Sequence, residues 1–105
     1  MKVMRQGDVM LVPVTKAPNG KRVKKDNGRQ ILAYGEVTGH AHAFEAEVAG
    51  KVTHVRTDDG KEFLTVTEEI PLTHEEHDTV VVSPGDYEVR RQVEYSPQEI
   101  RQVAD

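Results

Sequence analysis

Residues 52–67 carry the sequence feature that most restricts what this chain can fold into. Two segments rich in β-branched residues, 52–57 and 62–67, flank the tetrapeptide Asp58-Asp59-Gly60-Lys61. An Asp-Gly step favours the positive φ angles of a tight turn between two antiparallel strands. These residues are therefore predicted to form a β-hairpin, and the expected fold class is mainly β and antiparallel.

The rest of the chain continues this β pattern. A valine-rich opening segment, 1–14, favours extended structure and is interrupted at residues 6–8. In the last predicted strand, 87–95, apolar and polar side chains alternate, as expected of a strand with one buried face. Arg91 falls on the apolar face of that strand and needs a partner or an edge position. Further strands are predicted on both sides of a bend at residues 35–39, and at 79–83.

The length of 105 residues fits a single domain, 1–105, with one core. Residues 15–29 are rich in turn formers and basic side chains, so a flexible basic loop is expected there. Ser96-Pro97-Gln98-Glu99 forms a capping box with proline at the first helical position, which predicts a short C-terminal helix at 96–104. The expected architecture is a small antiparallel barrel or sandwich closed by this helix.

Composition excludes several classes of protein. The chain has no cysteine, which excludes disulfides, thiolate zinc ligands and a cysteine nucleophile. It contains no export signal and no stretch of roughly 20 apolar residues, so a cytoplasmic protein without a membrane partner is expected. The phosphate-binding and dinucleotide-binding glycine motifs are also missing. A small core with few aromatics makes a bound metal ion or a homo-oligomer a plausible source of added stability.

Two pairs of histidines are the only concentrated chemistry in the chain. His40 and His42 are two residues apart, so on a strand both imidazoles project from the same face. His74 and His77 are three apart, which brings them onto one side if residues 73–78 form a helical turn and not an open loop. Imidazole nitrogen suits zinc, iron, nickel and copper. We expect His40, His42, His74 and His77 to bind one divalent transition-metal ion, with zinc as first choice and iron or nickel as alternatives.

Carboxylates next to the histidines extend this hypothesis. Glu47 and Glu76 are candidates for an additional ligand or for a partner that orients an imidazole. A single histidine on a polar loop is usually just exposed, and it is the pairing that favours a site. His54 lies within the predicted hairpin and is expected to be structural. Whether a metal would be structural or catalytic, and whether the protein is an enzyme, is left open by these residues.

Two resemblances follow from the motifs. His40-Ala41-His42, with Glu47 after four intervening residues, is similar to the first metal-binding motif of cupins. Pro84-Gly85 resembles the turn that opens the second cupin motif, where Glu88 stands in the place of a histidine. A cupin likeness implies a small β-barrel with His40, His42 and Glu47 as metal ligands.

The chain as a whole resembles a group of short uncharacterised proteins of bacteria and their phages. The motifs that carry this likeness lie at residues 5–8, 35–42, 72–77 and 84–87. They include Gly-Glu-Val-Thr-Gly-His-Ala-His and Leu-Thr-His-Glu-Glu-His, which contain both histidine pairs. The resemblance implies a bacterial or phage protein and names no reaction.

Two other functions compete with a metal site. Lys21, Arg22, Lys24 and Lys25 lie in a segment with few opposing charges and are candidates for contact with the phosphates of nucleic acid. If this segment and the histidines converge, a metal-dependent or histidine-dependent phosphoesterase becomes a hypothesis. The remaining alternative is an interaction or assembly module, related to phage, whose histidines bind no metal.

Overall fold

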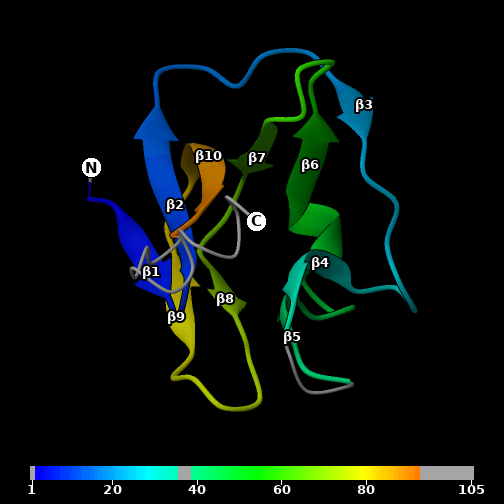
Figure 1. Ribbon diagram of the computed structural model, residues 1–105, viewed down its shortest axis with the longest axis vertical. Coiled ribbons are helices and arrows are strands. Elements are labelled where there is room, and N and C mark those ends of the chain that lie inside the picture. The colour runs from blue at the N-terminus through cyan, green and yellow to red at the C-terminus, as the bar shows by residue number, and fades with distance from the viewer. Residues whose placement is uncertain (1, 36–38, 93–105) are drawn as a thin grey trace, which may run out of the picture.

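The computed structural model describes residues 2–35 and 39–92, which form strands and one short 3-10 helix (Figure 1). Their order along the chain is β1 (Met4–Gln6), β2 (Val9–Val14), β3 (Lys21–Arg22), β4 (Gln30–Tyr34), β5 (Ala41–Phe44), η1 (Ala49–Lys51), β6 (Val52–Arg56), β7 (Glu62–Val66), β8 (Ile70–Leu72), β9 (Val80–Val82) and β10 (Gly85–Arg91). All strand pairs among these residues are antiparallel. The prediction of a mainly antiparallel β domain is confirmed.

The hairpin predicted at residues 52–67 forms, and a second hairpin forms near the N-terminus, where a single interrupted strand was predicted. β6 and β7 pair in register around a turn in which Gly60 has a φ of 87°. β1 and β2 are joined by a turn at Gly7, whose φ of 58° is one that residues with a side chain rarely adopt. The interruption expected at residues 6–8 is therefore a turn between two paired strands.

Six strands form the larger sheet, in the order β1-β2-β10-β7-β6-β3. Its two edges are the shortest strands, of three residues in β1 and two in β3. Because these edges are separate and nothing in the described residues pairs them with each other, the sheet stays open. Of the two architectures expected, a barrel or a sandwich, the barrel is wrong for this part of the chain.

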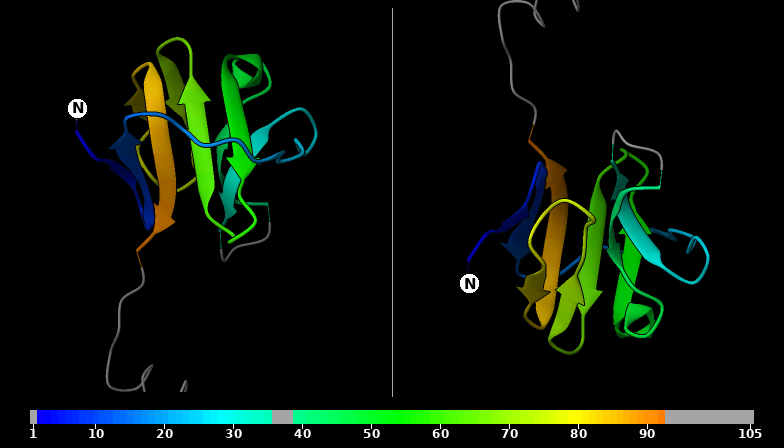
Figure 2. Two further views of the ribbon diagram at one scale, coloured as in Figure 1. Left: turned by 90° about the horizontal axis from the view of Figure 1, so that it is seen from above. Right: turned by 90° about the horizontal axis from the view of Figure 1, so that it is seen from below.

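Two short hairpins lie against one face of the larger sheet and form a second layer (Figure 2). They are β4-β5 and β8-β9, and an isolated antiparallel bridge between Ala43 and Thr73 joins one to the other. The hydrophobic core lies between the two layers. Leu11, Leu64 and Tyr87 of the larger sheet and Phe44, Ile70 and Leu72 of the hairpins are all buried in one cluster.

Several predictions about the ends and loops have mixed outcomes. Residues 15–29 include β3, which pairs with β6 at the sheet edge, so part of the expected loop is a strand. The helix predicted at 96–104 lies outside the described residues.

The helix η1 was not expected from the sequence. It is three residues long, and no helix among the described residues has the length and apolar character needed to cross a bilayer.

Candidate metal centre

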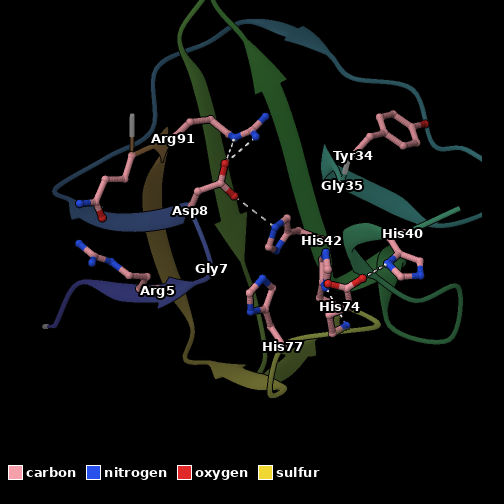
Figure 3. Close-up of a pocket in the computed structure, with 12 residues that line it drawn as sticks. Arg5, Gly7, Asp8, Tyr34, Gly35, His40, His42, His74, His77 and Arg91 are labelled. Carbon is pink, nitrogen blue, oxygen red and sulfur yellow. Dashed lines mark hydrogen bonds and ion pairs between the residues drawn. The ribbon is translucent and has the colours of Figure 1, made fainter. Parts of the chain in front are cut away.

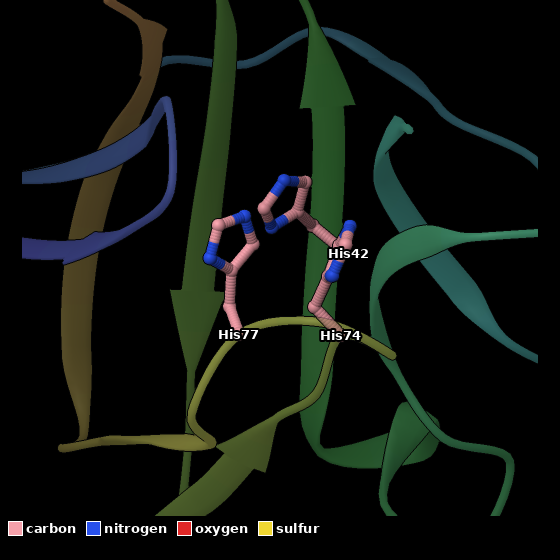
Figure 4. Close-up of side chains that lie close together, drawn as sticks. All are labelled: His42, His74 and His77. Carbon is pink, nitrogen blue, oxygen red and sulfur yellow. The ribbon is translucent and has the colours of Figure 1, made fainter. Parts of the chain in front are cut away.

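Three imidazoles from two separate segments meet at one end of the second layer (Figure 4). His42 lies in β5, and His74 and His77 lie in the loop between β8 and β9. Each of the three histidines offers one nitrogen, and these three nitrogens lie within 4.8 Å of one another. This is a spacing that one metal ion can bridge after small side-chain movements, because zinc binds imidazole nitrogen at about 2.0–2.1 Å.

The backbone explains why the two segments meet. Ala43 and Thr73 exchange two hydrogen bonds, Ala43 N–H to Thr73 O at 3.0 Å and Thr73 N–H to Ala43 O at 2.9 Å. This bridge places the first residue of the loop beside the strand that carries His42. The loop itself consists of bends, so of the two conformations considered for residues 73–78 the structure has the loop and not the helical turn.

The three rings are closely grouped but differ in exposure. The ring centroid of His74 lies 4.3 Å from that of His42 and 4.6 Å from that of His77, and those of His42 and His77 are 5.7 Å apart. His42 is buried, with 3% of its surface exposed, His74 is intermediate, and His77 is exposed. The group therefore runs from the core to the surface.

Gln6 links His42 to the loop that carries His74 and His77. It is 3% exposed, and its Nε2 donates hydrogen bonds to Leu72 O at 2.8 Å and to Asp78 O at 2.9 Å, the residues on either side of the histidine loop. Its Oε1 lies 2.9 Å from His42 Nδ1. Since the amide nitrogen is committed to two carbonyls, Oε1 must accept, and His42 Nδ1 carries the proton. This leaves the lone pair of His42 on Nε2, the form a metal requires.

Burial keeps the imidazole of His42 neutral. Its pKa is lowered from 6.5 to about 4, mainly because burial penalises the charged form and further because His74 would repel it. Asp8 faces the free nitrogen, with Oδ1 at 3.5 Å from His42 Nε2. Burial would raise the pKa of Asp8, but hydrogen bonds from Arg91 at 2.6 and 2.9 Å hold it below its usual value. Arg91, whose position on the apolar face of the last strand needed a partner, has one in Asp8.

A backbone hydrogen bond within the loop holds the ring of His74, and metal binding would break it. Glu76 N–H donates a hydrogen bond to His74 Nδ1 at 2.9 Å, which places the proton of a neutral ring on Nε2. An ion at Nδ1 displaces this donor, and an ion at Nε2 drives the proton to Nδ1, opposite the donor. Metal binding by His74 therefore breaks this hydrogen bond in either case.

The other predicted ligands lie near the trio or away from it. The ring of His40 is 6.0 Å from that of His74, and its Nδ1 lies 2.9 Å from Glu76 Oε1, outside hydrogen-bond alignment. His40 is not a member of the group with mutual 4.8 Å spacing. Glu47 is exposed and does not line the cavity beside the histidines. The geometry thus favours three ligands over the four predicted, with Glu76 at the rim.

A cavity of about 550 Å³ opens beside the trio (Figure 3). Polar groups line much of it, including Asp8, Glu76, Arg5 and Arg91, and two glycines complete its wall. A Cβ atom on Gly7 would lie 2.6 Å from His77 Nε2. The Gly7 turn thus lets the ring of His77 pack against the backbone. The volume is within the range of sites for small molecules, so an ion held by three imidazoles would face open space.

The basic residues lie in a different place. Lys21, Arg22 and Lys24 line a second cavity together with Arg56, and Lys25 is not part of its wall. The two cavities share no lining residue. The convergence on which a phosphoesterase would depend is therefore not found among the described residues.

Sequence reasoning missed three contributors to the centre: Gln6, Gly7 and Asp8. Their only signal was the interruption predicted at residues 6–8 of the opening strand, which the structure shows to be a turn. That this turn would lie against the histidines depends on a contact between β1 and residues more than 60 positions later. No local pattern reports such a contact.

Comparison with known proteins places the chain in a family without assigning it a reaction. A family model described as "Domain of unknown function (DUF8820)" matches residues 5–92, which include every residue of the centre. No curated protein and no solved structure matches the chain. The resemblance to uncharacterised proteins thus agrees with an uncharacterised family, whereas the cupin resemblance gains no support.

Proposed function

We propose that this chain, which belongs to the DUF8820 family, binds one divalent transition-metal ion through His42, His74 and His77. The observation that carries the proposal is the meeting of three imidazole nitrogens within 4.8 Å of one another, from a strand and a distant loop. Three protein ligands leave one position of a tetrahedral ion for water or a small ligand. The adjoining cavity supports a centre that is open and not closed.

The surroundings of the trio fit a metal site. His42 is neutral at pH 7 because of its lowered pKa, and Gln6 holds the ring proton on Nδ1, which leaves the lone pair on Nε2. Metal-bound histidines generally donate their second ring N–H to a carbonyl, amide or carboxylate oxygen, which fixes the ring. The amide of Gln6 has this role for His42. Imidazole ligands without thiolates suit zinc, and iron or nickel are the alternatives.

Metal titration with matched histidine variants tests the proposal. The purified protein is stripped with a chelator and titrated with Zn²⁺ by calorimetry, and with Co²⁺ by visible absorption, which reports coordination geometry. One ion per chain is expected. His77→Ala should abolish binding while leaving the fold intact, because His77 is exposed. His40→Ala is the control, since His40 lies beside the trio but outside it.

Two results would contradict the proposal. Equal loss of affinity in both variants would indicate a site with His40 as a fourth ligand. A chelated protein that takes up neither ion would favour the alternative of an interaction module without a metal.

A shift of the Glu76 amide resonance on metal loading is a further expected result, because metal binding by His74 breaks the hydrogen bond that this amide donates.

A further inference from the structure

A second cavity, of about 320 Å³, lies at the β3 edge of the larger sheet. Four cationic side chains line it: Lys21, Arg22, Lys24 and Arg56. Asp58 is the one carboxylate in its wall. The chain carries a net charge of −4, so this concentration of positive charge runs against its composition. We call these four side chains and the space between them the basic groove.

The backbone of the basic groove is held in place and is not a free loop. Lys21 and Arg22 form β3 and pair with β6. The next residue is anchored on both sides: Val23 N–H donates to His54 O at 2.8 Å, and Gln30 Nε2 donates to Val23 O at 3.2 Å. Because His54 and Gln30 are both buried, these anchors tie the basic segment to the interior.

The groove also brings like charges together. A Cβ atom on Gly20 would lie 2.7 Å from Arg56 O, so a glycine is what allows the chain to approach β6 here. This approach places Lys21 directly opposite Arg56 in the strand register. Like charges directly opposite each other on paired strands destabilise a sheet. A bound anion would relieve this repulsion.

Few carboxylates offset these cations. Within the residues that the structure describes, Lys21, Arg22 and Lys24 form no ion pair. Arg56 is positioned by Glu62 at 3.3 Å, and the same carboxylate holds buried His54 at 2.6 Å. Glu62 thus ties one cation of the groove to a buried histidine, while three cations remain available to a ligand.

We propose that the basic groove binds the phosphodiester backbone of nucleic acid without reading its bases. Clustered lysine and arginine side chains bind a phosphate chain by releasing its counterions. No aromatic side chain lines the groove, so base stacking has no platform there. The groove and the histidine cavity share no residue, so this proposal stands apart from metal binding.

Fluorescence anisotropy of a labelled single-stranded DNA tests the proposal on the full chain. The logarithm of the binding constant should fall linearly with the logarithm of salt concentration. Lys21→Gln/Lys24→Gln should reduce that slope by about 1.4, because each phosphate contact on a single strand contributes about 0.7. Lys2→Gln/Lys51→Gln is the control, because it removes the same charge from exposed or half-exposed sites outside the groove. Circular dichroism checks that both variants remain folded.

Three outcomes would overturn the proposal. The first is no binding by the parent chain at low salt. The second is an equal change of slope in both double variants, which would indicate attraction to the whole surface and not to the groove. The third is full displacement of the strand by an equal concentration of pyrophosphate, which would assign the groove to small phosphate compounds.

Discussion

Acidification should destabilise the metal-free protein through His42. Burial, and then repulsion by His74, lower the pKa of this imidazole from 6.5 to about 4 in the folded state. The unfolded chain therefore takes up a proton near pH 6.5, and the folded chain does so only near pH 4. The contribution of His42 to the free energy of unfolding is full above pH 6.5 and is lost progressively as pH falls to about 4.

The magnitude follows from the difference between the two pKa values. Each pKa unit corresponds to about 1.4 kcal/mol, so the loss across this window is about 3 kcal/mol. Small domains are stable by roughly 5–15 kcal/mol, which makes the loss a substantial part of the total. His54 acts in the same direction, because burial lowers its pKa as well. The pH dependence of the parent chain alone does not isolate His42.

A variant that cannot titrate isolates the contribution. The side chain of His42→Asn retains an N–H that can donate to Gln6 Oε1, and it carries no ionisable group. Urea unfolding of both chelated proteins is followed by circular dichroism between pH 4 and 6.5. The stability advantage of the parent over the variant should shrink by about 3 kcal/mol across this window. Parallel curves for the two proteins would refute the reasoning, since they would mean that His42 is free to charge in the folded state.

Two further predictions concern the turn beneath the histidines. Gln6→Met removes the amide and keeps a side chain of similar size, so metal affinity should fall about 10- to 100-fold. The ¹⁵N chemical shifts of His42 in the metal-free protein should no longer show a single Nδ1–H tautomer. An unchanged tautomer would show that Gln6 does not set it. Gly7→Ala should destabilise the fold more than Gly60→Ala does. Both glycines have a positive φ, but only at Gly7 would the new methyl group meet a side chain, 2.6 Å from His77. Equal losses of stability in urea unfolding would argue against this contact.

Local sequence determined much of the fold. The β6-β7 hairpin follows from an Asp-Gly turn between β-branched segments, and the β1-β2 turn follows from Gly7. Both depend only on φ angles and on residues that are neighbours in the sequence. The open sheet was not predicted in the same way. Whether a sheet closes into a barrel depends on which strands lie at its edges. The edge strand β3 lies in a segment whose sequence predicts a basic loop.

For the histidines, the sequence by itself determined which residue types could bind a metal and that they occur in two pairs. Only the tertiary structure decided which of them meet. The Ala43–Thr73 bridge brings His42 to the loop, while His40 turns toward Glu76. Gln6 reaches His42 from β1, and no local sequence pattern indicates this contact. The physical reason is that a metal site depends on distances between side chains, and those distances are set by long-range strand pairing and burial, not by spacing along the chain.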